Sequence, residues 1–420
     1  MKRHTNIFIA VVLTLALFAF AGCTHTTGWR KGNIHTHSLW SDGKDYPETV
    51  VDWYKSNGYN FLALSDHNIF SQGQKWTDVN DAAKEEVFRK YSERFGEKWV
   101  ERRTTDKGLQ VRLKPIGEFR CLFEEPNRFL LVGAEEITGK KPRVHINAFN
   151  LREPVQPKDS NTVVETLQND TDAVLTQSAN SGQMMIFQIN HPNWRWVLTA
   201  EDIMQIKAAK FFEVYNGHSK VYNNGDRYRA GTERMWDIIL SKRLAELNLP
   251  IIYGTATDDA HNFHKYGPES ANPGQGWVMV RADYLTPESI IRAMENGDFY
   301  ASTGVVLEDI QFDGKTLKVK IKPEIGVSYT TRFIGTLKGC DLTSKPVIDA
   351  NGAEIHTTQI YSSDIGRVLA EVKGTAASYT CTGNEIYVRA KVISTKPKYN
   401  AATAGGVEVA WVQPVIPKSR

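Results

Sequence analysis

The sequence carries almost no excess charge. Its 51 lysines and arginines nearly balance its 48 aspartates and glutamates, which gives a net charge of +3 over 420 residues. Such a small net charge gives no reason to expect a nucleic acid or another polyanion as a partner. Hydrophobic residues make up 41% and charged residues 24%, as in ordinary globular proteins. The length is sufficient for two domains, or for one large and one small domain.

Long apolar runs are also scarce, and one stands at the start of the sequence. Residues 7–21 are almost wholly apolar, follow a basic start and end at Phe20-Ala21-Gly22-Cys23. This run is short for a membrane span and has the flanks of a secretory signal. It resembles a bacterial lipoprotein signal, in which the cysteine becomes the lipidated first residue; an ordinary cleaved signal is the alternative. We therefore expect residues 1–23 to be the signal, Cys23 the lipidation site and residues 24–30 a tether. The protein would be exported and anchored only by lipid to the periplasmic or cell-surface face of a bacterial membrane.

Only three cysteines follow Cys23. Cys340 and Cys381 fall in the same C-terminal segment and, because export permits disulfides, could pair. Cys121 is expected to be a small buried apolar residue. No Ser-His-Asp arrangement is recognisable by motif, so nothing points to a serine nucleophile.

Histidine is more informative, because six of the eleven histidines fall in short polar motifs or near the ends of apolar runs. His35 and His37 are separated by one residue, and an extended strand would turn both side chains to the same face. Such a pair alone is a weak signal, and solvated loop histidines are the alternative. The complete set of candidate ligands is His35, His37, His67, His145, His191 and His261, with Asp42, Glu136 and Asp259.

These residue types indicate a metal centre of a particular kind. Imidazole together with carboxylate suits zinc, manganese or iron better than calcium or magnesium. Nine candidate ligands are too many for one tetrahedral ion. The sequence therefore predicts two or three divalent metal ions with a bridging carboxylate.

Alternating apolar strands and helices predict a mainly parallel α/β barrel or sheet over residues 31–304. We expect strands at 33–35, 61–64, 129–134, 145–149, 184–189, 211–215, 251–256 and 276–280. Helices are expected at 46–56, at 160–182 with a break near 169–170, at 231–247 and at 286–296. In such barrels the chemistry lies at the C-terminal ends of the strands, where most of the candidate ligands fall.

Two stretches depart from this rhythm. Residues 71–128 are rich in charge, and we interpret them as an insertion with one or two helices that could overhang the site. From residue 305 to 420, apolar residues alternate with lysines at period two, which predicts a small antiparallel, sandwich-like β domain.

Five short motifs in this order resemble the PHP (polymerase and histidinol phosphatase) superfamily of metal-dependent phosphoesterases. The resemblance covers about residues 32–304. The motifs are His35-Thr36-His37 with Asp42, Ser65-Asp66-His67-Asn68, Gly133-Ala134-Glu135-Glu136-Ile137-Thr138, His191-Pro192 and Asp259-Ala260-His261.

The resemblance implies a distorted seven-stranded β/α barrel and a division of the ligands among three metals. One metal would take His35, His37, Glu136 and Asp259. A second would share Glu136 and take His145 and His191, and a third would take Asp42, His67 and His261. Glu135 competes with Glu136 as the bridge, and the family pattern favours Glu136.

The expected activity is hydrolysis of a phosphoester of a small phosphorylated molecule. Clustered divalent ions lower the pKa of a bound water, so that a hydroxide can attack phosphorus in line. Glu136, Asp66 and Arg195 are the candidate catalytic residues, with Arg195 able to bind phosphate bidentately or to have a structural role. Asp66 and Asp258 would orient ligand imidazoles, with turn capping as the alternative.

Other roles remain open from sequence. His264 and Lys265 could line the mouth of the site, whereas His218 and Tyr222 are interpreted as structural. A metal-dependent hydrolase of a carboxylic or carbamic ester or an amide is one alternative function. A non-enzymatic surface binding protein is another.

Overall fold

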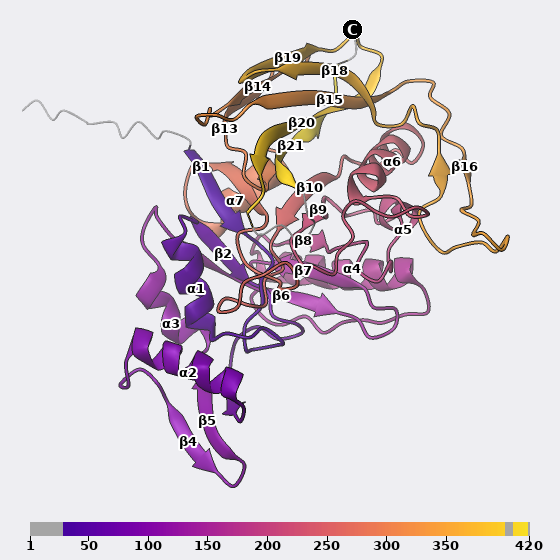
Figure 1. The fold of residues 1–420 in the computed structure, drawn as a ribbon. Coiled ribbons are helices and arrows are strands. Elements are labelled where there is room, and N and C mark those ends of the chain that lie inside the picture. The colour runs from indigo at the N-terminus through magenta and orange to yellow at the C-terminus, as the bar shows by residue number, and fades with distance from the viewer. Residues whose placement is uncertain (1–27, 400–405, 419–420) are drawn as a thin grey trace, which may run out of the picture.

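The computed structural model describes residues 28–399 and 406–418, and Figure 1 shows their arrangement. The expected signal and Cys23 lie outside the described residues. Of the expected tether, residues 28–30 are the first residues of strand β1 (Gly28–Asn33), which pairs with β11 (Trp277–Ala282). None of the described helices is long and apolar enough to cross a membrane.

The fold is mixed α/β, built on a 13-stranded sheet in the order β10-β9-β8-β7-β6-β2-β1-β11-β12-β21-β20-β15-β18. The strands nearest the candidate ligands are β1, β2 (Phe61–Leu64), β6 (Leu130–Thr138), β7 (His145–Phe149), β8 (Ile186–Ile189), β9 (Phe211–Asn216) and β10 (Tyr253–Thr257). Strand β7 runs antiparallel to β6 and β8, whereas the other neighbours in this run are parallel. Because β11 and β12 (Phe299–Ser302) are antiparallel as well, the expectation of a mainly parallel sheet is corrected to a mixed one.

The first and last strands of the run from β1 to β10 meet just beyond their C-terminal ends. The N–H of Asp259 donates to the carbonyl of His35 at 3.0 Å, and the N–H of His37 donates to the carbonyl of Ala260 at 2.9 Å. Candidate ligands from opposite ends of this run are thereby held side by side.

The C-terminal region consists of two facing sheets. One continues the large sheet through β12 into β21 (Val407–Val415), β20 (Glu385–Pro397), β15 (Tyr329–Leu337) and β18 (Arg367–Lys373). The other contains β13 (Leu307–Phe312), β14 (Thr316–Ile321) and β19 (Ala376–Thr380), and the apolar residues predicted by alternation fill the space between the two sheets. Two short strands, β16 (Ser344–Lys345) and β17 (Ile360–Tyr361), form a separate pair near α6 (Figure 1).

A buried ion pair ties this region to helix α6 (Thr232–Ala245). Arg389 on β20, which is 1% exposed, donates two hydrogen bonds of 2.7 Å to the carboxylate of Asp237, and Tyr387 donates a third of 2.7 Å. A bidentate pair of this kind fixes orientation as well as distance. The ion pair holds β20 of the C-terminal region against helix α6.

The remaining helices pack around the large sheet. They are α1 (Pro47–Ser56), α4 (Val163–Ser181), α5 (Ala200–Met204) and α7 (Pro287–Glu295). In α7 the expected start is confirmed, since the Thr286 side chain accepts from the Ser289 N–H and Pro287 opens the first turn. Helix α4 has no break near residues 169–170, which corrects the expectation. There the Asp170 carboxylate is turned out of the helix and accepts the N–H of Lys158 at 2.7 Å.

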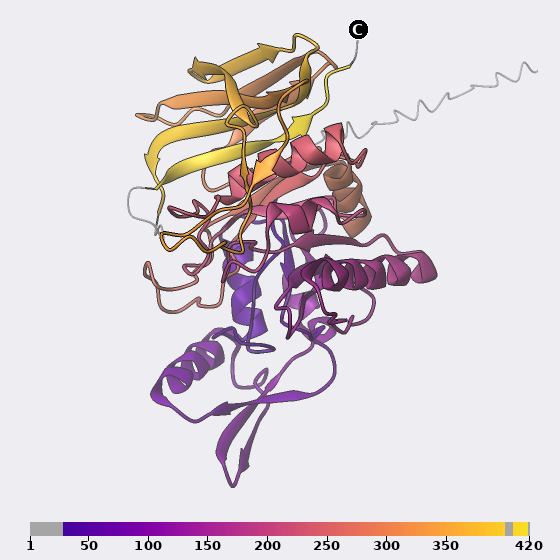
Figure 2. The same ribbon diagram turned by 90° about the vertical axis from the view of Figure 1, so that its right-hand side faces the viewer.

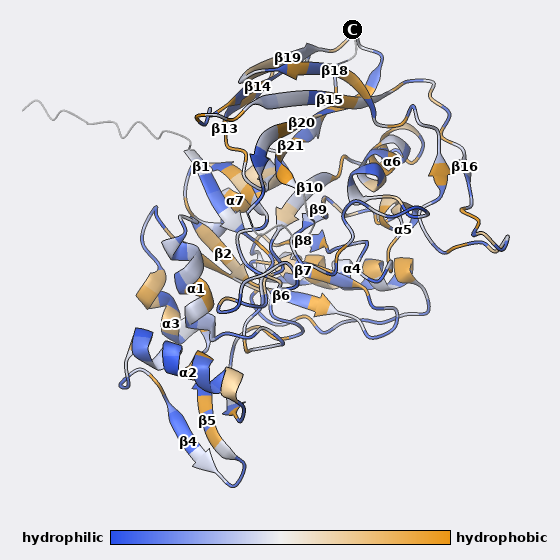
Figure 3. Ribbon diagram, in the orientation of Figure 1, coloured by the Kyte–Doolittle hydropathy of each residue, from blue (hydrophilic) through white to orange (hydrophobic). Residues whose placement is uncertain are grey.

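The insertion forms a small lobe at the opposite end of the molecule from the C-terminal sheets (Figures 1 and 2). It contains β3 (Lys75–Val79), α2 (Ala82–Phe95), β4 (Arg102–Thr105), β5 (Gly108–Leu113) and α3 (Ile116–Phe123). Helices were expected, but the three-stranded antiparallel sheet β3-β5-β4 was not. Helix α2 is mostly hydrophilic (Figure 3) and buries only Val87 and Tyr91, which pack with Trp40 and Tyr46 in one apolar cluster.

All three cysteines in the described part of the chain are free. Cys340 and Cys381 are not paired. Cys121 is exposed on α3, so the expectation of a buried position is wrong.

Candidate metal centre

The two histidines after β1 point at the same place, as their spacing predicted. Both rings are fully buried, and the Nε2 atoms of His35 and His37 lie 3.3 and 3.2 Å from Oδ1 of Asp259. The same two nitrogens lie 3.5 and 3.4 Å from the two carboxylate oxygens of Glu136. His35, His37 and Asp259 therefore converge from the ends of β1 and β10, and Glu136 on β6 contacts both histidines.

The spacing of these atoms fits a metal ion. Ligand atoms about 2.0–2.1 Å from a tetrahedral zinc lie about 3.3 Å from one another, close to the separations above. Nε2 of His35 and Nε2 of His37 are buried without a hydrogen-bond partner among the described residues. Orphaned polar atoms are costly to bury, so their convergence indicates a bound cation.

A second group shares Glu136. Its Oε1 lies 3.0 Å from Nδ1 of His145 and 3.2 Å from Nε2 of His191, and the side-chain amide of Asn190 donates to it at 2.8 Å. Of the two neighbouring carboxylates, Glu136 is therefore the one that faces the histidines. Glu135 faces the other side of β6, where it accepts the N–H of Val155 at 2.8 Å.

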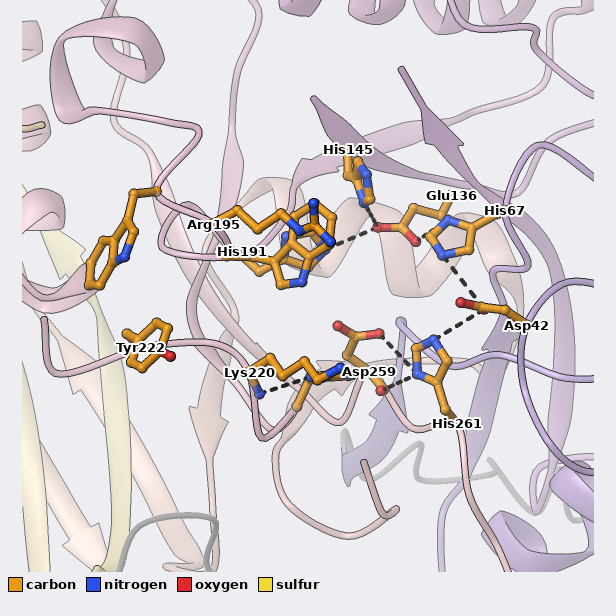
Figure 4. A pocket seen from close by; sticks show the side chains of 13 residues that line it. Asp42, His67, Glu136, His145, His191, Arg195, Lys220, Tyr222, Asp259 and His261 are labelled. Atoms are coloured by element: carbon orange, nitrogen blue, oxygen red, sulfur yellow. Dashed lines mark hydrogen bonds and ion pairs between the residues drawn. The ribbon is translucent and has the colours of Figure 1, made fainter. Parts of the chain in front are cut away.

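A third group lies at the open edge of the cluster. Oδ1 of Asp42 lies 3.2 Å from Nε2 of His261 and 3.7 Å from Nε2 of His67 (Figure 4). The Asp42 side chain is 57% exposed, whereas Glu136 and Asp259 are buried. Nδ1 of His67 also lies 2.8 Å from Glu136, and His37 is close enough to serve two groups. All nine candidate ligands therefore converge, but His35, His37, His67 and Glu136 each belong to two overlapping groups.

The two buried carboxylates of the cluster keep their negative charge. Burial disfavours the charge of Glu136, but His67, His145 and His35 outweigh it and hold its pKa well below the usual range. Burial also disfavours the charge of Asp259, but His35 and His37 outweigh it and hold the pKa of Asp259 well below its usual range. Burial and the neighbouring His261 lower the pKa of His37 to about 3, so this ring is neutral, the form that binds metal.

Glu213 is the main supporting residue, and sequence reasoning assigned it no role. It is fully buried, and its Oε1 lies 2.7 Å from Nδ1 of His35, which leaves Nε2 of that ring for the metal. Its Oε2 accepts the backbone N–H of His191 at 2.7 Å and the amide of Asn216 at 2.8 Å. The only signal in the sequence is a carboxylate within an otherwise apolar strand, Phe211–Tyr215.

Asp66 and Asp258 do not contact a ligand imidazole. Asp66 accepts the N–H and hydroxyl of Ser38, both at 2.8 Å, and the hydroxyl of Ser41 at 2.6 Å. Since Oγ of Ser41 lies 3.4 Å from Nδ1 of His37, Asp66 acts on that ring only through Ser41. The catalytic role expected for Asp66 is thereby corrected to a positioning role.

Asp258 has the capping role that was its alternative. It accepts from the hydroxyl of Tyr54 at 2.9 Å and from the N–H groups of Gln275 and Gly276 at 2.5 and 2.8 Å.

Three residues of the site have left-handed backbone conformations that are uncommon outside glycine. The φ angles are 49° at Asp259, 52° at Arg195 and 58° at Trp196. Such conformations cost free energy and persist where the surroundings enforce them, often at functional sites.

The ligands open into a pocket of about 490 Å³. Arg195 lines it, as expected, together with residues that sequence reasoning had left structural or unassigned: Trp194, Trp196, His218, Lys220 and Tyr222. His264 does not line this pocket and instead contacts Asp45 at 3.0 Å, and Lys265 does not line it either. No residue of the insertion contributes to the pocket walls among the described residues, so the expected overhang is wrong.

Comparison with solved structures gives several similar chains, two of which are as follows. One, from Bacteroides vulgatus, is described as a two-domain protein containing a predicted PHP-like metal-dependent phosphoesterase. It is 15% identical with a TM-score of 0.37, over 90% of this chain and 94% of that one. The other, from Bifidobacterium adolescentis, is described as a "putative metal-dependent phosphoesterase". It is 15% identical with a TM-score of 0.29, over 56% of this chain and 88% of that one. No protein-family model and no curated protein matches the chain. At these TM-scores neither likeness establishes an activity, which has to be inferred from the residues of the site.

Proposed function

We propose that the protein is a metal-dependent phosphoesterase of the PHP type that acts on a small phosphorylated molecule. The observation that carries the proposal is the convergence of nine imidazole and carboxylate groups, with orphaned buried atoms, around a pocket. The seven-stranded barrel of that family belongs to the same proposal. It is supported by the hydrogen bonds that join the segments after β1 and β10.

The structure offers enough ligands for two or three divalent ions. His35, His37, Glu136 and Asp259 would hold the first, and Glu136 with His145 and His191 the second. Asp42, His67 and His261 would hold a third, more exposed ion. When bound, zinc, manganese or iron ions supply a hydroxide at neutral pH and neutralise the charge of the phosphate oxygens.

Arg195 is the candidate residue for binding the phosphate, because it lines the same pocket as the metal ligands. Its side chain lies on the pocket wall with the guanidinium over the ring of Trp194, 4.8 Å from the centroid, and it forms no ion pair with any described residue. A planar guanidinium beside an aromatic ring and without an acidic partner can donate two parallel hydrogen bonds to a phosphate. Arg195 would thus orient the phosphate against the metal ligands.

His218 supplies a further donor. Its Nδ1 accepts the N–H of Lys220 at 3.0 Å, so the neutral ring carries its proton on Nε2. Burial and the nearby His261 lower the pKa of His218 to about 4, against the attraction of Asp259, so the ring is neutral at pH 7. It belongs to none of the ligand groups and is therefore available to donate to a substrate oxygen.

Export and lipidation at Cys23 are part of the proposal and rest on the sequence of residues 1–23. The proposal also includes a division of the chain into a catalytic region of residues 31–304, with the insertion at 71–128, and a β domain of residues 305–420.

The test is phosphate release by the chain that begins at residue 24, loaded with manganese or zinc, across a panel of phosphomonoesters and phosphodiesters. Aryl carboxylic esters of matched size serve as controls. Release of phosphate that disappears on chelation supports the proposal. Hydrolysis of the carboxylic esters alone, by metal-loaded protein, would replace it with an esterase.

A further inference from the structure

The pocket extends well beyond the metal ligands. Figure 4 shows Asp42 and His261 at one side and Tyr222 at the opposite side, with Arg195 and Lys220 between them. A volume of about 490 Å³ is in the range of pockets for ligands of drug-like size. Phosphate and metals would occupy one end only, so the far end has room for the group to which the phosphate is attached.

Two stacked aromatic side chains, Trp196 and Tyr222, form the wall at the far end of the pocket. Tyr222 stacks on Trp196, with ring centroids 5.1 Å apart and an interplanar angle of 12°, and the guanidinium of Arg229 lies over the Trp196 ring at 4.7 Å. Arg229 is itself held by Asp226 at 2.6 Å. Tyr222 remains 55% exposed although it stacks on Trp196. The stack therefore presents a fixed flat surface to the pocket.

The backbone under this wall is braced. The side-chain amide of Asn193 donates to the carbonyls of Tyr222 and Ala230 at 2.8 and 3.0 Å. A bridge pairs Trp194 with Val221, which joins the loop after β8 to the loop after β9. A surface held in advance in this way loses little conformational freedom when a ligand binds.

Lys220 adds a positive charge beside this surface. Its side chain is exposed, and it forms no ion pair or hydrogen bond with any other side chain in the described part of the protein. The carboxylates of the metal cluster are already surrounded by histidines. The charge of Lys220 is thus available to a ligand.

We propose that this wall binds the leaving group of the substrate, and that the leaving group has a flat ring and carries its own anionic substituent. The ring stacks on Tyr222, and Lys220 pairs with the anionic group, a carboxylate or a second phosphate. The assignment of the ring to a leaving group rests on the proposed phosphoesterase function, whereas the binding preference does not.

The test uses phosphonates, which cannot be hydrolysed, and calorimetric titration of the metal-loaded chain from residue 24 onward. The ligands are methylphosphonate, 4-carbamoylbenzylphosphonate and 4-carboxybenzylphosphonate. The first lacks a ring, and the other two differ mainly in charge. The wild type should prefer the carboxylate to the carboxamide by about tenfold, as expected for a charged pair.

The variants separate the two contacts. Lys220→Met should abolish the preference for the carboxylate, whereas Lys318→Met, on the exposed face of β14, should retain it. Tyr222→Ala should weaken both ring ligands relative to methylphosphonate by about three- to tenfold, and Tyr222→Phe should restore them. A wild type that shows neither preference, or preferences that survive Lys220→Met and Tyr222→Ala, would overturn the proposal.

Hydrolysis of 4-carboxybenzyl phosphate distinguishes this inference from the proposed function. Binding with the expected dependences but without phosphate release would overturn the phosphoesterase and leave the subsite standing. Phosphate release that is insensitive to both substitutions would retain the phosphoesterase and overturn the subsite.

Discussion

Replacing Glu213 by glutamine tests the support of the metal centre without touching a ligand. The change keeps the size of the side chain but removes the charge that faces Nδ1 of His35 at 2.7 Å and the N–H of His191 at 2.7 Å. The hydroxyl of Thr257 also donates to this carboxylate, at 2.5 Å. Loss of a group that orients a metal-bound histidine lowers metal affinity by about 10–100-fold, or about 1.4–2.8 kcal/mol. Because Glu213 holds residues of two ligand groups, we expect the upper half of that range.

Competition with a chromogenic chelator measures this affinity directly. Glu135→Gln is the matched control, since Glu135 is also a buried carboxylate but faces away from the ligands and accepts the N–H of Val155. The control should bind metal as the wild type does. If Glu213→Gln bound metal within about twofold of the wild type, the assigned role of Glu213 would be refuted.

Three further changes have defined outcomes. Burial raises the pKa of Glu135 from 4.5 to about 8, so the folded protein keeps a proton that the unfolded chain releases, and stability falls as pH rises between these values. The free energy of unfolding of Glu135→Gln, measured by chemical denaturation, should therefore rise by several kcal/mol relative to that of the wild type between about pH 5 and 8. A difference between the two unfolding free energies that stays constant with pH would contradict this. Arg195→Met should raise KM for a phosphomonoester by about tenfold or more, with partial recovery in Arg195→Lys; an unchanged KM would place the phosphate elsewhere. In cells, Cys23→Ser should prevent incorporation of labelled fatty acid and release the protein from the membrane fraction, and equal labelling of both forms would exclude Cys23 as the anchor.

Short motifs predicted which histidines and carboxylates converge, because each motif is a local pattern near the end of one strand. His35 and His37, for instance, are two residues apart, and their extended backbone turns both rings to Asp259. The alternation of lysines with Leu317, Val319 and Ile321 likewise predicted a strand with one buried face.

The residues whose roles were missed or assigned incorrectly depend on contacts between distant segments. The roles of Glu213 and Asp66 are set by side chains some 180 and 25 residues away, and nothing in their neighbouring sequence distinguishes support from capping. His218 and Tyr222 enter the pocket through a loop whose path is fixed by Asn193. In the insertion, the sheet was missed because its strands are short and partly exposed, and β4 lacks apolar residues.

The central claim is that imidazoles and carboxylates from distant segments form one multinuclear metal centre, and its most direct test is the metal content of the purified protein. Elemental analysis of the chain from residue 24, after reconstitution with manganese or zinc and removal of free ions, should give two or three equivalents. Because Glu136 contacts ligands of more than one group, Glu136→Gln should lose at least one of them. Less than one equivalent in the wild type, or equal content in Glu136→Gln, would contradict the account.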